Sequence, residues 1–305
     1  MDYLRAFLIA TLSSLLLAKL SELLAPRLGL LDRSNERKIH RGVRPIGGLA
    51  LFGALLLGAG PFLTWARPSA SLILGSALIV GLGVLDDRRG LGAKTKLLAQ
   101  ALAALVPILW GGISVRSIAF WGLSLELGGW GIPLTALWVV GITNALNFLD
   151  GLDGLAAGSS CIFLGFIGLF AWQAGDPTTL LLALALLGST VGFLRYNLYP
   201  ARLFLGNEGA YLLGFLLGVL ALEPFAPEFG PISNLPPSAP LLLLGLPIAD
   251  TIFAVIRRAL AGRSIFAPDQ GHIHHRLLAR WGHKRALWIS YAVSLILSLI
   301  AVACH

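Results

Sequence analysis

Long apolar runs recur along the chain and set the strongest limit on how it folds. A helix needs roughly 20 apolar residues to cross the hydrocarbon core of a bilayer. Ten segments approach that length: 3–24, 47–64, 69–85, 97–114, 132–149, 155–174, 177–194, 210–226, 239–256 and 286–303. Of the 305 residues, 56% are hydrophobic and only 12% are charged, as in lipid-embedded helices. The sequence therefore predicts an all-α, polytopic membrane bundle of about ten transmembrane helices.

Lys and Arg residues are concentrated in alternate connections between these segments. Six lie in 25–46 and seven in 257–285, whereas the opposite set of connections holds only Arg67 and Arg116. Because cationic loops stay on the cytoplasmic side, we expect both termini to be extracytoplasmic and five loops to face the cytoplasm. The formal net charge of +8 then reflects topology and attraction to anionic membrane lipid. No nucleic-acid partner is expected.

The chain is expected to form one integral membrane domain over residues 1–305. It contains no internal repeat and no linker long enough to separate two domains. The first apolar run has neither a cationic start nor a small-residue cleavage site, which favours a mature helix over a signal peptide.

The unusual polar clusters all fall in or beside the connections assigned to the cytoplasmic side. They occupy 37–48, 86–100, 144–155, 202–209 and 268–276. Each has a simpler explanation by itself, because acidic pairs at helix ends are often solvated and basic loops often mark topology alone. Ionisable residues in membrane proteins are expensive to keep, however, and their common placement predicts a site at one membrane face.

The cluster at 144–155 is the hardest to explain as a solvated helix end. Its polar members step by three, so that successive ones are neighbours on a helix: Asn144, Asn147, Asp150 and Asp153. No Lys or Arg occurs between Arg116 and Arg195. The missing counter-charge suggests that a metal ion or a bound cation supplies it.

The types of side chain in these clusters favour a hard metal ion and a phosphorylated substrate. Carboxylate oxygens without thiolates point to Mg²⁺, with Mn²⁺ as the alternative, and such ions bridge substrate phosphates. Adjacent residues of a helix point about 100° apart, so Asp86 and Asp87 are expected to play different roles. Histidine and arginine together suit phosphate oxygens better than a zinc site. A diphosphate substrate is implied.

In this order, the motifs resemble the polyprenyl-phosphate N-acetylhexosamine-1-phosphate transferases. The resemblance rests on Arg-Lys-Ile-His with Pro-x-Gly-Gly, Asp-Asp-x-x-x-Leu with Lys96 and Gln100, Asn-x-x-Asn-x-x-Asp-Gly-Leu-Asp-Gly-Leu, and His-Ile-His-His-Arg-Leu. It implies transfer of N-acetylhexosamine-1-phosphate, most often N-acetylglucosamine-1-phosphate, from its UDP ester to undecaprenyl phosphate, with release of UMP. This would be the first membrane step of a cell-envelope glycan such as lipopolysaccharide or teichoic acid. A bacterial inner-membrane location and a homodimer are further implications.

The resemblance also assigns roles to individual residues. Asp86 and Asp87 would serve the acceptor phosphate and the metal, and Asp150 and Asp153 the metal and the nucleotide. The remaining substrate-binding residues would be Lys38, His40, Lys96, Asn147, His272, His274, His275 and Arg276.

One departure from the family pattern concerns a metal ligand. The family usually has Gly-Asp-x-Gly-Ser, whose Asp binds Mg²⁺, whereas this chain has Gly206-Asn207-Glu208-Gly209-Ala210. We expect metal binding by Asp87, Asp150, Asp153 and Asn207, with Glu208 replacing the lost charge. Two alternatives stay open at this point: an inactive or weakly active homologue, and a secondary transporter.

Overall fold

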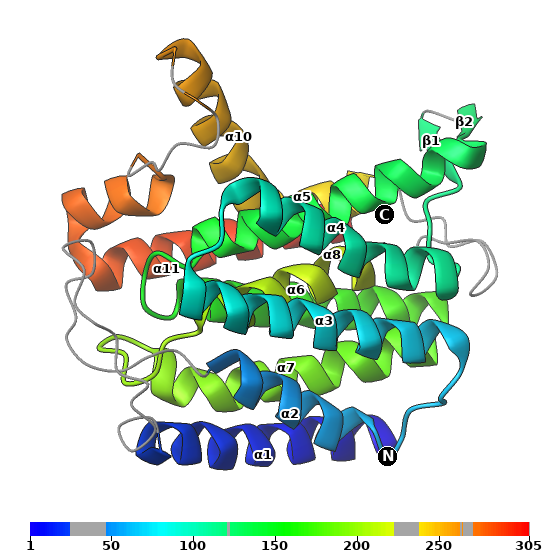
Figure 1. Ribbon diagram of the computed structural model, residues 1–305, viewed down its shortest axis with the longest axis horizontal. Helices are drawn as coiled ribbons and strands as arrows, with labels where there is room; N and C mark the ends of the chain where they lie inside the picture. Colours follow the sequence, from blue (N-terminus) through cyan, green and yellow to red (C-terminus); the bar gives the residue numbers. More distant parts are fainter. Residues whose placement is uncertain (25–46, 121–122, 223–237, 263, 265–270, 305) are drawn as a thin grey trace.

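The computed structural model describes residues 1–24, 47–120, 123–222, 238–262, 264 and 271–304. Within these ranges the chain forms eleven α-helices (Figure 1). They are α1 (Asp2–Leu24), α2 (Gly47–Ala59), α3 (Arg67–Arg89), α4 (Ala93–Leu105), α5 (Gly131–Leu149), α6 (Leu155–Ala174), α7 (Pro177–Asn197), α8 (Gly206–Leu220), α9 (Ser238–Leu243), α10 (Gly245–Leu260) and α11 (Ile273–Ala303). A π-helical turn at Val106–Trp110 extends α4, and β1 (Ser117–Phe120) pairs antiparallel with β2 (Leu123–Glu126). The all-α prediction is confirmed apart from this hairpin.

Seven helical segments of the described chain are long and apolar enough to cross a membrane. They comprise α1, α3, α4 with its π-helical extension, α5 with the preceding turn, α6, α7 and α11. The expected spans at 47–64, 210–226 and 239–256 contain shorter helices, and the last is divided into α9 and α10. The count of ten is therefore not confirmed. Hydropathy measures how apolar a segment is, but it does not distinguish a helix facing lipid from one enclosed by protein.

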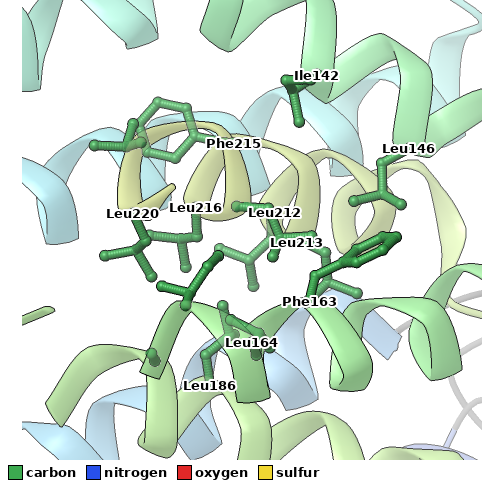
Figure 2. Packing of buried hydrophobic residues seen from close by; sticks show 14 of the residues in the cluster. Ile142, Leu146, Phe163, Leu164, Leu186, Leu212, Leu213, Phe215, Leu216 and Leu220 are labelled. Carbon is green, nitrogen blue, oxygen red and sulfur yellow. The ribbon is translucent and has the colours of Figure 1, made fainter. Parts of the chain in front are cut away.

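Helix α8 is enclosed on all sides. Nearly every residue from Glu208 to Leu220 is buried, and the helix packs against α2, α3, α5 and α6. Figure 2 shows Leu212, Leu213 and Leu216 of α8 close to Phe163 and Leu164 of α6. A helix that is apolar around its whole circumference belongs in a protein core, so its 15 residues need not reach across the bilayer.

Small residues set the close packing of α1 against α2 and α7. The buried positions of α1 recur every fourth residue at Ala6, Ala10, Ser14 and Ala18. A Cβ atom added at Gly192 of α7 would lie 2.5 Å from the carbonyl oxygen of Thr11. Lipid supplies no hydrophobic drive between helices, so such interfaces depend on close backbone approach.

Apart from α10, the long helices run roughly parallel or antiparallel, which separates the molecule into two ends (Figure 1). The α3–α4, α5–α6 and α7–α8 connections and the start of α11 lie at one end, on the left in Figure 1, and both chain termini lie towards the other. Exposed tryptophans lie in or beside the connections at the terminal end, including Trp65, Trp110, Trp130 and Trp172. Tryptophan is enriched where a membrane protein meets the lipid–water interface. The expected grouping of the polar connections at one end is confirmed for the described residues.

We predict that Gly192→Ala lowers the thermal unfolding midpoint in detergent, because its new methyl group would push α1 away from α7. Overpacking of this kind costs about 1–3 kcal/mol. The matched control is Gly165→Ala on α6, where an added Cβ meets nothing within 4 Å and alanine favours the helix. Equal midpoints for both variants would contradict the packing described here.

Candidate functional site

Asp86 is buried at the end of α3 and is held by three donors from different parts of the chain. Its carboxylate accepts hydrogen bonds from Lys96 Nζ at 2.7 Å and Tyr211 Oη at 2.8 Å. The third donor is the backbone N–H of Leu91 at 2.9 Å. Gly90 adopts a left-handed conformation with φ of 64°, which permits the turn that brings Leu91 back to Asp86. Asp86 therefore joins the polar ends of α3, α4 and α8.

Asp87 points towards a different set of partners at the start of α8. Its Oδ2 accepts the backbone N–H of Asn207 at 2.9 Å, and its Oδ1 accepts Asn207 Nδ2 at 2.8 Å. The amide oxygen of Asn207 in turn accepts Asn147 Nδ2 at 2.9 Å. The two carboxylates thus face different partners, as their helical positions predict. A carboxylate beside the first N–H groups of a helix is also stabilised by the helix dipole.

Glu208 places a second carboxyl group beside Asp87. Its side chain is 2% exposed and hydrogen-bonds to the Asp87 carboxyl group. Two ionised carboxylates in contact repel each other, so a proton or a cation between them would stabilise the pair. Glycines make the space for it: a Cβ added at Gly48 or Gly83 would lie 2.2 Å from atoms of Glu208.

The connection from 150 to 154 is fixed by α11 and by the α7–α8 connection. Asp153 Oδ2 accepts the backbone N–H of Ala201 at 3.0 Å, and the carbonyl oxygen of Asp153 lies 3.1 Å from His283 Nε2. The carbonyl oxygen of Gly154 accepts Tyr291 Oη at 2.6 Å. The Asp153 side chain is therefore turned towards the chain that leads into α8.

The histidine run meets an aspartate that the motifs did not include. Asp250 of α10 is 1% exposed. Its Oδ2 lies 3.0 Å from His272 Nδ1 and 3.6 Å from His274 Nδ1, and its Oδ1 accepts the backbone N–H of Ile273 at 2.7 Å. His275 packs its ring 4.3 Å from that of His274, centroid to centroid, while Arg276 is exposed.

Further contacts connect the clusters to one another. Asn144 Nδ2 donates to Gln100 Oε1 at 2.6 Å, which joins the second cluster to the third. The ring of Phe148 lies 5.4 Å from that of His272, centroid to centroid. A Cβ added at Gly151 would lie 2.3 Å from His274 Nε2, so this ring packs directly on the 150–154 connection. Four of the five clusters therefore come together; of the first, residues 37–46, with Lys38 and His40, lie outside the described residues.

The expected metal ligands do not form a complete cage. Among the described residues, no group of three His, Cys, Asp or Glu side chains lies close enough to hold a metal ion. In particular, Asp153 faces Ala201 rather than Asp87, so Asp87, Asp150 and Asp153 do not surround a shared ion in this arrangement. Asp87, Asn207 and Glu208 do lie in contact. That donor set fits Mg²⁺, which typically takes one or two carboxylates and completes its shell with water and substrate phosphate.

Three residues of this region were not predicted from the sequence: Tyr211, Asp250 and His283. Asp250 carried a detectable signal, because it is a lone acid inside an apolar run and such residues are functional candidates by default. Tyr211 and His283 carried none, since a tyrosine in an apolar helix and a histidine in a basic segment are both ordinary.

An open cavity of about 650 Å³ lies between α10 and the start of α11. Its walls combine apolar side chains with two guanidinium groups: Phe253, Ile256, Leu260, Arg257 and Arg276. Such a lining suits an amphiphile with an anionic head.

Several known proteins are similar to this chain over nearly its whole length. Residues 69–224 match the family model described as glycosyl transferase family 4. A probable undecaprenyl-phosphate N-acetylglucosaminyl 1-phosphate transferase of Bacillus subtilis is 39% identical over 97% of this chain and 83% of its own. A decaprenyl-phosphate N-acetylglucosaminephosphotransferase of Mycobacterium tuberculosis is 35% identical over 88% of this chain and 74% of its own. The undecaprenyl-phosphate alpha-N-acetylglucosaminyl 1-phosphate transferase of Escherichia coli K12 is 30% identical over 99% of this chain and 83% of its own.

We predict that Lys96→Met destabilises the protein, because it removes the ammonium group from the nearly inaccessible carboxylate of Asp86. Breaking a buried, charge-assisted hydrogen bond costs roughly 2 kcal/mol or more. Lys94→Met is the control, since Lys94 is exposed two residues earlier on the same helix. Unfolding in a denaturant series should separate the two variants; equal loss in both would contradict the role given to Lys96.

Proposed function

The chain belongs to glycosyl transferase family 4, the polyprenyl-phosphate N-acetylhexosamine-1-phosphate transferases, and from that premise we propose its reaction in detail. As a family member it is a membrane-embedded phosphotransferase. The proposed reaction transfers N-acetylglucosamine-1-phosphate from UDP-N-acetylglucosamine to undecaprenyl phosphate and releases UMP. The observation that carries this proposal is 39% identity over 97% of the chain to one relative. The name of that relative states both the transferred group and the acceptor.

The proposed mechanism is a single in-line displacement by the acceptor phosphate. The second pKa of a phosphate monoester is about 6. The acceptor phosphate is therefore largely a dianion at neutral pH and needs no general base. Three donors already occupy the carboxylate of Asp86, which makes it a poor candidate for a nucleophile. This arrangement supports direct attack over a covalent enzyme intermediate. Asp86 instead holds Lys96 and Tyr211 in place at the end of α3.

The donor's diphosphate is proposed to bind beside the 150–154 connection and the histidine run, because the His274 ring packs directly on Gly151. Asp150 and Asp153 serve the nucleotide side, with Asn147 and Lys96 at the margin. His272, His275 and Arg276 face the phosphates, and His274 supports the ring of His272. The buried guanidinium of Arg258 lies 5.9 Å from the ring centroid of Phe148 and adds positive charge nearby. Most of the rate enhancement in phosphoryl transfer comes from such positioning and charge stabilisation.

Asp87, Asn207 and Glu208 are proposed to hold Mg²⁺, with Mn²⁺ as an alternative ion. When bound, the ion neutralises charge on the transferring phosphoryl group. Glu208 would supply the negative charge that Asn207 lacks. Its buried position against Asp87 supports this role.

The acceptor is proposed to enter along the cavity between α10 and α11. The apolar wall formed by Phe253, Ile256 and Leu260 suits a polyprenyl chain, and Arg257 and Arg276 suit its phosphate. We place this end of the bundle at the cytoplasmic face of the bacterial inner membrane, because the cationic connections gather there. The homodimer stays a prediction.

Neither alternative function gains support. The relatives described above are all named as transferases, which gives no support to a transporter or to an inactive homologue. A transporter commonly places ionisable groups at the bilayer midplane between repeated halves. Here the described clusters lie at helix ends, and the sequence shows no repeat.

We predict that detergent-purified protein, supplied with Mg²⁺, undecaprenyl phosphate and UDP-N-acetylglucosamine, forms UMP and a lipid-linked aminosugar phosphate in equal amounts. Mass spectrometry detects the lipid product, and UDP-glucose tests the need for the acetamido group. Omitting the lipid should abolish UMP formation. Labelled UDP-sugar entering proteoliposomes without UMP would refute the transferase proposal, and a phosphosugar adduct on the protein would refute direct attack.

We predict that Glu208→Gln raises the Mg²⁺ concentration required for half-maximal activity by roughly tenfold, a typical effect of weakening a metal site. Asn207→Asp should lower it, because a third carboxylate then faces the ion. Glu126→Gln in the hairpin is the control. Mn²⁺ binding to the purified variants, followed by electron paramagnetic resonance, should change in the same order without any turnover. Unchanged Mg²⁺ dependence in Glu208→Gln would exclude Glu208 as a ligand.

A further inference from the structure

Asp250 lies outside every motif of the site, yet among the described residues its carboxylate is the most enclosed charged group beside the histidine run. It is 1% exposed, and His272 and His274 are 5% and 2% exposed. A buried carboxylate is costly unless hydrogen bonds compensate for its lost hydration. Two close contacts do so here, from His272 and from the backbone of Ile273. Both partners belong to the segment that begins α11.

These contacts determine which ring nitrogen of His272 carries hydrogen. An ionised carboxylate only accepts hydrogen bonds, so the His272 Nδ1 atom at 3.0 Å from Asp250 Oδ2 must be the donor. In a neutral imidazole, Nε2 is then left as an acceptor; in an imidazolium, Nε2 is a second donor. In either state the polar atom available to a ligand is Nε2.

The neighbouring rings hold the His272 imidazole in one orientation. The ring of His274 stacks on it with centroids 5.6 Å apart and planes inclined by 14°, and Phe148 approaches at 5.4 Å. His274 itself lies 3.6 Å from Asp250 Oδ2, which is too long for a hydrogen bond. Both nitrogens of the His274 ring are buried without a hydrogen-bond partner. Of the two rings, that of His272 therefore lies within hydrogen-bond distance of Asp250, while His274 packs against Gly151.

We propose that Asp250 is a positioning residue, which fixes His272 in the Nδ1–H form and aims its Nε2 at the phosphates of the donor substrate. This inference rests on the proposed function for the identity of the ligand, but the pairing itself does not. A carboxylate that holds a histidine in this way sets both its tautomer and its direction, and an amide in its place favours the wrong tautomer.

The test is Asp250→Asn, which keeps the size of the side chain. The backbone N–H of Ile273 retains the amide oxygen as its acceptor, so the NH₂ group faces His272 Nδ1 and forces the hydrogen to Nε2. We expect kcat to fall by about 100-fold or more, with KM for both substrates changed far less. The matched control is Asp176→Asn, a buried aspartate that caps α7 at the opposite end, where asparagine caps equally well. Its activity should equal that of the wild type.

Nitrogen-15 spectra of histidine-labelled protein test the pairing without turnover. The wild type should show His272 with hydrogen on Nδ1, assigned by the signal lost in His272→Gln, and Asp250→Asn should move it to Nε2. A wild-type His272 with hydrogen on Nε2 alone would overturn the proposal, even if Asp250→Asn fails to fold. Wild-type kcat in a folded Asp250→Asn variant would overturn it as well. A wild type that makes no lipid-linked product with any UDP-sugar would refute the proposed function, while the spectra still decide the pairing.

Discussion

The carboxylate of Asp87 accepts two hydrogen bonds from Asn207, and this contact holds the polar ends of three helices together. Asp87 lies in the last turn of α3, Asn207 lies in the first turn of α8, and Asn147 reaches the same amide from α5. The contact is strong because a carboxylate meets a backbone N–H at the positive end of a helix dipole. It also depends on α8 being enclosed by its neighbours, since only a fixed helix presents its first N–H at a constant place.

Negative charge at this end of the bundle is balanced locally and in different ways. Asp86 is paired with the ammonium group of Lys96 and the phenol of Tyr211. Asp87 contacts Glu208 and accepts from the amide of Asn207, and Asp250 is paired with the imidazole of His272. Each of these pairings leaves different atoms available to a ligand. The Asp86 carboxylate has three hydrogen-bond donors, the Asp87 group offers carboxyl oxygens to the proposed cation, and the Asp250 group occupies only one of the two ring nitrogens of His272. Four acids of similar character thereby form three groups that differ in their neighbours.

Much of the architecture was predictable because its causes are local along the chain. Apolar runs predicted the helices, and the Lys and Arg pattern predicted which connections share one end. The three-residue spacing of Asn144, Asn147 and Asp150 placed them correctly at the end of α5. The number of spans was not predictable, because α8 is as apolar as a lipid-facing helix and differs only in what surrounds it. Asp250 was overlooked because its partners lie 22 and 23 residues further on, beyond any helical periodicity.

The sequence by itself determined that this is a helical membrane protein with its reactive groups at one end, since hydropathy and charge act on each segment independently of the others. It also determined the chemical types available there: carboxylates, amides, histidines and cations. Only the tertiary structure decided which of them are partners. Asp87 and Asn207 are 120 residues apart, and whether they meet depends on the packing of whole helices. The direction of each side chain, and hence its chemistry, follows from that packing.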